Sequence, residues 1–116
     1  MNYTLETEKD IRQLSKFGVD LKIYSAIDET CGVVLVHVED GHNEEFRHLE
    51  STFTYIVLEG RGTFYLNDES VDVSKGDRIS IKPNTNIYYK GKMQMVLITT
   101  PAWSAEQEVE VRQRVW

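Results

Sequence analysis

The most regular feature of the chain is an alternation of apolar and polar residues that repeats at every second position. This period is typical of strands that turn one face to a core and the other to solvent. It predicts strands at positions 19–25, 33–38, 53–58, 63–66, 71–73, 79–81, 87–89 and 95–100. Short segments rich in Gly, Asn and Asp separate these strands, as turns require. About eight short strands joined in this way predict an all-β jelly-roll barrel.

The segment 8–17 departs from this period. Thr7 is followed three residues later by Asp10, which is the spacing of a helix N-terminal box. Ile11, Leu14 and Phe17 then recur at helical spacing, before a glycine that ends the pattern. The spacing predicts a short amphipathic helix over 8–17 that packs against the barrel. At the other end of the chain, the segment 109–116 fits a short helix and a strand equally well.

Glycines punctuate the stretch 46–62, which reads FRHLESTFTYIVLEGRG. Gly60 and Gly62 separate the strand predicted at 53–58 from the one predicted at 63–66. A Gly-x-Gly segment between two strands predicts a β-hairpin with a tight turn, in which one of the glycines has a positive φ. The segment 90–92, with Gly91 between two lysines, predicts a further turn on the same grounds.

The segments YIVLEGRG and GDRISIKPNT resemble the two sequence motifs of the cupin superfamily. The resemblance extends over about positions 33–101, most of the chain. It implies a double-stranded β-helix, the jelly-roll barrel that these proteins share. On this reading, residues 1–116 form a single cupin domain, with a barrel at 20–101 and a C-terminal extension at 102–116.

The resemblance also locates the positions at which cupins bind a divalent metal, normally two histidines and a glutamate in the first motif and a histidine in the second. When the first motif is counted back from Gly60, its ligand positions fall on Phe46, His48 and Phe53, and that of the second motif falls on Ile87. Only His48 can ligate a metal, and a catalytic metal normally has three protein ligands. We therefore expect a metal-free protein without a cofactor.

A second register, counted back from Gly62, keeps more of the possible ligands. It places His48 and Glu50 on the two histidine positions and Tyr55 on the glutamate position, which leaves two plausible ligands, with His42 or Glu44 as the third. It breaks the agreement of YIVLEG with the family motif, and it still leaves Ile87 at the position of the last histidine. The first register is the better match.

The residues predicted to face the barrel interior define the candidate site. His48 is a candidate general base because imidazole titrates near neutral pH, and Tyr55 is a candidate proton donor. The resemblance supports this pair, since some metal-free members of the wider family isomerise or epimerise nucleotide-linked sugars with a histidine and a tyrosine. The ligand-binding candidates are Phe46, His48, Phe53, Tyr55, Ile87 and Tyr89. The alternative is that His48 bonds to a neighbouring carboxylate such as Glu50, while the tyrosines belong to the core.

Length and charge narrow the functions further. The chain has 116 residues and a net charge of −6, so binding to a phosphate backbone is not expected. We expect a protein that binds a small polar molecule, such as a saccharide, inside the barrel. One alternative is a metal-independent isomerase or epimerase of nucleotide-linked sugars that uses His48 with a tyrosine. Another is a dimeric interaction module whose barrel is filled with side chains.

Partners and location follow from the same reading. The strand at 33–38 would be an exposed apolar edge in a monomer, so a homodimer is expected. Trp103 is expected either to cover one end of the barrel or to pack against a second subunit. Charged residues interrupt the first thirty positions, so no signal peptide is predicted, and no apolar run is long enough to cross a membrane. These features predict a cytoplasmic protein that binds neither membrane nor nucleic acid.

Overall fold

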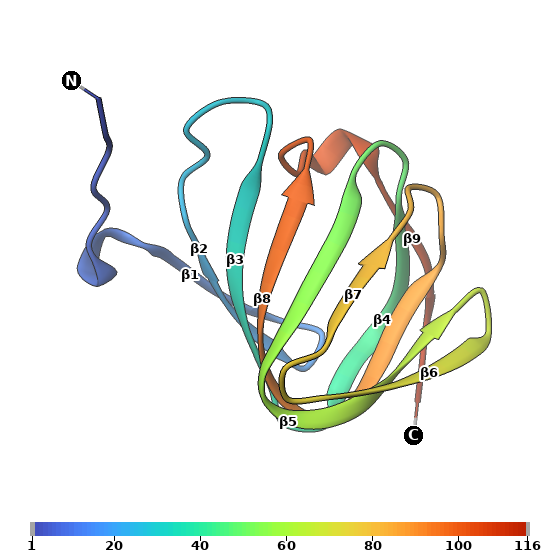
Figure 1. Cartoon of the computed structure of the whole chain (residues 1–116). Helices are drawn as coiled ribbons and strands as arrows, with labels where there is room; N and C mark the ends of the chain where they lie inside the picture. Colours follow the sequence, from blue (N-terminus) through green and yellow to red (C-terminus); the bar gives the residue numbers. More distant parts are fainter. Residues whose placement is uncertain (1, 116) are drawn as a thin grey trace.

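The computed structural model describes residues 2–115, which form a curled antiparallel sheet of nine strands with two short 3-10 helices (Figure 1). The predicted all-β barrel is confirmed. The helices are η1 (Glu8–Asp10) and η2 (Ala105–Gln107). The strands are β1 (Arg12–Lys16), β2 (Val19–Ile23), β3 (Gly32–Val38), β4 (Gly41–His48), β5 (Thr52–Leu66), β6 (Glu69–Ser74), β7 (Arg78–Ile81), β8 (Ile87–Thr100) and β9 (Glu108–Gln113).

Two long strands, β5 and β8, run antiparallel along their whole length and hold the barrel together. The first part of β5 also pairs with β7, and its second part pairs with β6. Likewise, β8 pairs with β4 near its start and with β3 near its end. Because each long strand takes part in both walls, the sheet curls over on itself and encloses an interior.

The bend in these strands corrects two predictions. Gly60 does not make a hairpin turn, because β5 continues through it and pairs with β8 on both sides. Gly91 likewise lies inside β8 and makes no turn. Both glycines have the positive φ that side chains disfavour, 85° and 124°. A Cβ on Gly60 would lie 2.1 Å from the carbonyl oxygen of Lys92, so the two strands cross too closely for any side chain.

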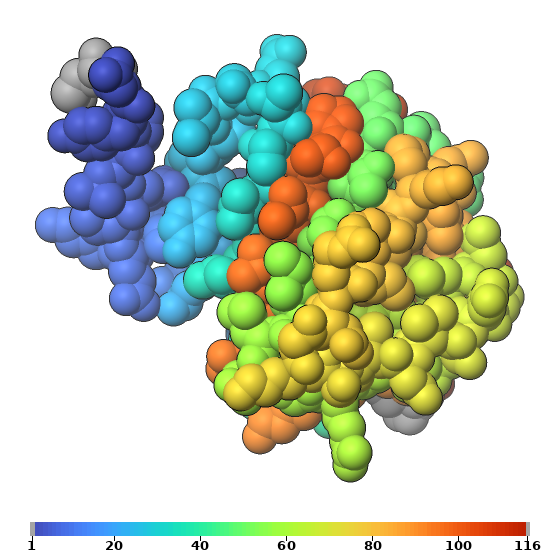
Figure 2. Space-filling model, in the orientation of Figure 1, coloured from blue at the N-terminus to red at the C-terminus, as the bar shows by residue number. Residues whose placement is uncertain are grey.

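The predicted helix at 8–17 is also wrong. Only a three-residue 3-10 turn forms, and β1 follows it and pairs with β2. Phe17 and Gly18 connect these strands, and both have positive φ, which is the turn that suits a two-residue hairpin. The helical spacing was misleading because Leu14 and Phe17 face the barrel interior from a strand and a turn. Figure 2 shows the N-terminal segment at one side of the body formed by the later strands.

The segment 109–116, which the sequence left open between helix and strand, is a strand as far as Gln113, where it belongs to β9 and pairs with β4. Trp116 lies outside the described residues. The carboxylate of Glu45 on β4 is buried and lies 2.9 Å from nitrogens of both Arg112 and Arg114. Removing one partner of a buried ion pair leaves an uncompensated charge, so this contact holds β9 firmly in place. As a result β9 covers the edge of the strand that carries His42.

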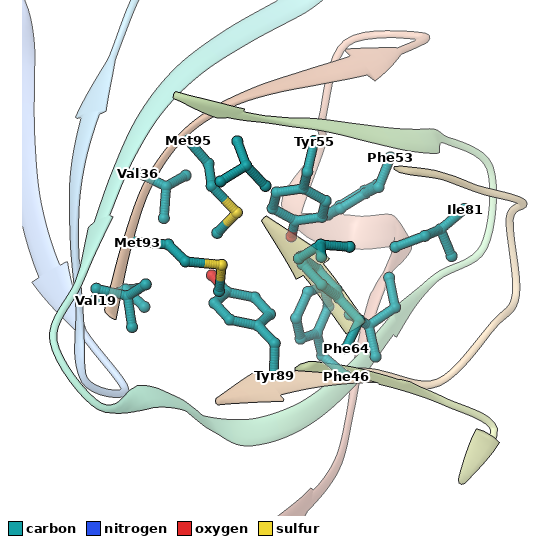
Figure 3. Close-up of a cluster of buried hydrophobic side chains, with 14 residues drawn as sticks. Val19, Val36, Phe46, Phe53, Tyr55, Phe64, Ile81, Tyr89, Met93 and Met95 are labelled. Atoms are coloured by element: carbon teal, nitrogen blue, oxygen red, sulfur yellow. The ribbon is translucent and has the colours of Figure 1, made fainter. Parts of the chain in front are cut away.

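The core fills one side of the interior. Figure 3 shows that Phe46, Phe53, Tyr55 and Tyr89 point inward from β4, β5 and β8. The remaining members of the buried cluster are aliphatic, aromatic or sulphur-containing: Val19, Val36, Val38, Val57, Phe64, Val73, Ile81, Ile87, Met93 and Met95. The family resemblance therefore identified the inward parity of β4 and β5 correctly.

Candidate active site

A cavity of about 390 Å³ lies beside this core. Its walls come from the β1–β2 hairpin, the inner faces of β3, β4, β5 and β8, and the segment that leads from β8 to β9. Small-molecule sites are usually concave, largely apolar and carry a few convergent polar groups. The cavity has this character, with aromatic walls and a small number of polar side chains, among them Arg12, Lys16, His42, Glu44, Tyr55, Tyr89 and Glu108.

An irregularity interrupts β4 where its polar residues line this cavity. His42 lies opposite Tyr89 and Phe46 opposite Ile87, so four steps along β4 match only two along β8. Extra residues of this kind bend a strand and redirect its side chains, and such bulges are common beside active sites. His42, Glu44 and Phe46 share one parity along β4, and all three line the cavity.

His42 is the most strongly perturbed base of the cavity. Its Nδ1 lies 2.8 Å from the backbone oxygen of Glu44. A carbonyl can only accept, so Nδ1 carries the proton, and Nε2 is left as the basic nitrogen. Burial lowers the pKa of His42 to about 4, and the positive charge of Lys16 acts in the same direction. The imidazole is therefore neutral at pH 7 and ready to accept a proton.

Two phenols lie next to this imidazole. The ring of Tyr89 has its centroid 5.4 Å from that of His42, and the ring of Tyr55 lies 5.7 Å from that of Tyr89, edge to face. Both tyrosines are buried, and burial raises the pKa of each above its ordinary value. Each phenol therefore keeps its proton at neutral pH. One neutral base and two protonated acids thus share one cavity.

The β1–β2 hairpin supplies another wall of the cavity. The backbone N–H of Asn43 donates to the carbonyl of Phe17 at 2.9 Å, which fastens the hairpin turn to β4 beside His42. The ring of Phe17 has its centroid 5.6 Å from that of His42. The ammonium of Lys16 lies over the rings of Phe17 and Trp103, at 5.6 and 5.7 Å from their centroids. This arrangement holds a cation at the cavity wall by cation–π attraction.

Trp103 also orients a carboxylate. Its indole N–H donates to Glu108 at 3.1 Å, and both residues line the cavity. The sequence offered two places for Trp103, over one end of the barrel or against a second subunit. The structure places it at the wall of the cavity.

His48, the catalytic candidate of the sequence, lies in a different setting. It is buried, but it is not among the residues that line the cavity. Its Nδ1 accepts the backbone N–H of Ser51 at 2.9 Å, and its Nε2 lies 3.1 Å from the backbone oxygen of Ser104. Both ring nitrogens are therefore engaged by the backbone. The partner is backbone and not the side chain of Glu50, which the sequence suggested as the alternative.

The other predicted site residues divide into two groups. Phe46, Phe53, Tyr55 and Tyr89 line the cavity, whereas Ile87 is buried in the core and does not. The sequence considered His42 and Glu44 only as metal ligands, although they share the parity of Phe46. Lys16 and Phe17 could not be found, because they were assigned to the end of a helix.

The donor set does not suit the metal of the family. Phe46, Phe53 and Ile87 occupy three of the four ligand positions in the better register, and none of them has an electron pair to donate. Within residues 2–115, no three side chains of His, Cys, Asp or Glu come together as a metal site requires. The second register fails on geometry, because both nitrogens of His48 are bound to the backbone.

Known structures show where this fold and site belong. Streptomyces Pac13 in its H42Q form with uridine matches with a TM-score of 0.95 and 38% identity, over 98% of this chain and 95% of that chain. Pac13, described as a unique nucleoside dehydratase, matches with a TM-score of 0.95 and 39% identity, over the same shares of both chains. Ectoine synthase from P. lautus matches at 11% identity with a TM-score of 0.74, over 98% of this chain and 94% of that chain, and shares the fold alone.

No protein-family model matches the chain, and no curated protein matches it. The curled barrel and its cavity define the protein as a small cupin. The chain belongs to the cupin family, together with Pac13. Further Pac13 structures with uridine carry Y55F or Y89F. This chain has His42, Tyr55 and Tyr89 at the three numbers altered in those proteins.

Proposed function

We propose that this protein is a nucleoside dehydratase, with His42 as its base and Tyr89 as its acid. One observation carries the proposal: His42, Tyr55 and Tyr89 line a single cavity, and the same three numbers are altered in Pac13 structures that contain uridine. The relative is described as a nucleoside dehydratase and is 39% identical to this chain. The cavity volume of about 390 Å³ lies in the range of small-molecule sites.

The proposed reaction is an elimination of water from the sugar. Nε2 of His42 takes a proton from a sugar carbon, and the electron pair of that C–H bond forms a carbon–carbon double bond. The C–O bond on the neighbouring carbon breaks, and the hydroxyl leaves as water with the proton of Tyr89. A proton then passes from the imidazolium to the tyrosinate, which restores both groups. Nothing is oxidised or reduced.

The weak basicity of His42 restricts the substrate. An imidazole whose pKa is about 4 removes only a proton that the substrate itself makes acidic. We therefore expect a nucleoside whose sugar carries a carbonyl group next to the carbon that loses its proton. Negative charge then develops on that carbonyl oxygen, and the O–H group of Tyr55 is positioned among the cavity walls to stabilise it.

This proposal changes the functions considered from the sequence. The catalytic histidine becomes His42, because both nitrogens of His48 are engaged by the backbone. Epimerisation and dehydration share the first step, removal of a proton from carbon, so the same site serves either once the proton is gone. A cavity of this volume argues against a barrel that is entirely filled. Binding without turnover is the remaining alternative.

Proton abstraction and water loss can be tested separately. Purified protein is incubated in D₂O with uridine in which the sugar is oxidised to carry a carbonyl group, and NMR follows deuterium entry into the sugar. Mass spectrometry follows the loss of one water. The His42→Gln variant is expected to slow both by roughly 100- to 10,000-fold, the usual contribution of general acid–base catalysis.

His37→Gln is the matched control, because His37 is half-exposed and pairs with Glu39 at 2.8 Å outside the cavity. It should react as the wild type does. Exchange that is equally fast in His42→Gln would remove His42 from the mechanism. Tight uridine binding without exchange or water loss would instead favour a binding protein.

Three expectations from the sequence stay predictions: the homodimer, the metal-free state and the cytoplasmic location. The strand expected to be an exposed edge is not one, because β3 pairs with β2 on one side and with β8 on the other. Native mass spectrometry reports both the number of subunits and any bound metal. Among residues 2–115, no helix is long and apolar enough to cross a membrane.

A further inference from the structure

We infer that Glu44 and Glu108 bind the two neighbouring hydroxyl groups of the ribose, so that the site selects ribonucleosides over deoxynucleosides. This inference rests on the proposed function, and it assigns a role to two carboxylates that the reaction does not use. Both side chains line the same cavity as His42.

Glu44 is the unusual member of the pair. Only 9% of its surface is exposed, yet within residues 2–115 its carboxylate makes no hydrogen bond or ion pair. Burial raises the pKa of this carboxyl, and the negative charges of Glu110 and Glu108 add to the rise. Its oxygens are not among the fully buried side-chain atoms that lack a partner, so they remain accessible from the cavity and can accept a hydrogen-bond partner there. A ligand in the cavity that donates hydrogen bonds would supply that partner.

Glu108 reaches the cavity from the C-terminal strand β9. The indole N–H of Trp103 donates to one of its carboxylate oxygens, which orients the group. An ionised carboxylate accepts up to four hydrogen bonds, so Glu108 keeps capacity for a ligand. Two acceptor groups thus meet in one cavity whose walls are otherwise mainly apolar and aromatic.

The chemistry of the carboxylates favours the sugar over the base. A carboxylate only accepts hydrogen bonds, and the vicinal hydroxyls of ribose offer two donors side by side. An acidic residue that bonds to ribose hydroxyls is also the usual device of dinucleotide-binding folds. The pairing edge of uracil instead offers a single N–H donor between two carbonyl oxygens. The partial negative charges of these oxygens repel a carboxylate. Near His42, these carboxylates would therefore hold the part of the molecule that reacts.

The test is a calorimetric comparison of four probes: uridine, 2′-deoxyuridine, 3′-deoxyuridine and 3-methyluridine. With the wild-type protein, each deoxynucleoside is expected to bind roughly 10- to 100-fold more weakly than uridine, the usual effect of a lost hydrogen bond to a charged group. 3-Methyluridine should bind nearly as well as uridine. In Glu44→Gln and Glu108→Gln, the discrimination against the deoxynucleosides should shrink, because an amide accepts more weakly.

Glu110→Gln is the matched control, since Glu110 lies on β9 next to these residues but does not line the cavity. It should keep the discrimination of the wild type. Equal binding of uridine and both deoxynucleosides would overturn the inference and leave the dehydratase proposal standing. The inference would also be overturned if 3-methyluridine alone bound weakly, because that result would mean that the carboxylates bind the uracil base and not the ribose. If no nucleoside binds, the proposed function fails and the inference with it. The comparison of the four probes with the wild-type protein tests the inference even if a variant does not fold.

Discussion

Two histidines on the same strand of this barrel have opposite chemistry. His42 and His48 both lie on β4 and are both buried, with 8% and 2% of their surfaces exposed. Burial therefore does not distinguish them. His48 has both ring nitrogens bound to backbone groups, whereas His42 uses only Nδ1 in this way and faces the cavity with the rest of its ring.

The comparison shows which buried histidine keeps a ring nitrogen that is available to accept a proton. A histidine with two backbone partners is a structural crosslink, because any proton transfer would break one of its bonds. A histidine with one partner has a fixed tautomer and a second nitrogen that remains basic. The two ends of β4 thus differ in role. His48 at one end is bound to the backbone of neighbouring segments, and His42 at the other end turns a basic nitrogen toward the cavity.

The largest expected effect is the dependence of stability on pH that His42 contributes. Its pKa is about 4 in the folded protein and 6.5 in the unfolded chain. Below pH 6.5 the unfolded chain therefore binds a proton that the folded protein refuses, and stability falls until the pH reaches the folded pKa. Between pH 7 and pH 4 the free energy of unfolding should drop by roughly 3 kcal/mol from this group.

Urea unfolding of the wild type and of His42→Gln at several pH values isolates this effect. Glu44 has a raised pKa and acts with the opposite sign, since it stabilises the folded protein at low pH and loses that contribution as the pH rises. Both proteins contain Glu44, so its contribution is largely common to them. Identical pH profiles for the two proteins would show that His42 is not held neutral by burial.

A smaller effect is expected at the other histidine. His48→Gln takes away the Nδ1 atom that accepts the Ser51 N–H, places its amide groups differently, and so also changes the contact with the backbone of Ser104. The unpaired buried groups should cost about 2 kcal/mol in the free energy of unfolding, with turnover per folded molecule nearly unchanged.

Ser104→Ala is a suitable control, because His48 bonds to the backbone oxygen of residue 104 and the substitution keeps that atom. Its stability should match that of the wild type. If His48→Gln lost turnover and kept its stability, the division between the two histidines would be reversed.

The smallest effect concerns Lys16, whose charge helps to keep His42 neutral. Lys16→Met should raise the pKa of His42 toward its ordinary value, as measured by NMR titration of the imidazole ring. Lys22→Met removes a charge that pairs with Glu8 outside the cavity, and it should leave the titration unchanged. A lower pKa of His42 in Lys16→Met would show that the ammonium does not act on the imidazole through its charge.

The sequence predicted the fold well because the period of two and the family motifs report the same inward parity. Phe46, Phe53 and Tyr55 face the interior, as that parity requires. The glycine signals were harder to interpret. A glycine such as Gly60 indicates a positive φ, but whether the chain reverses or only bends depends on the partner strand, here β8, which is distant in sequence.

The site was predicted less completely, for a similar reason. His42 shares the inward parity of Phe46, but the sequence considered it only as a metal ligand, and its place beside Tyr89 depends on pairing with the distant strand β8. Lys16 and Phe17 reach the cavity through a hairpin turn that resembles a helix end in the pattern of apolar residues. The role of His48 depends on its hydrogen bonds to the backbone, and the order of apolar and polar residues in the sequence does not predict such bonds.

The crossing of the two long strands has a practical consequence for protein engineering. At Gly60 and Gly91 a Cβ atom would lie 2.1 and 2.6 Å from backbone oxygens of the opposing strand. Backbone cannot step aside as a flexible side chain does, so a saturation library at these codons would yield almost only unfolded clones. A library designed to accept new substrates should therefore vary the residues of the cavity wall and keep both glycine codons unchanged.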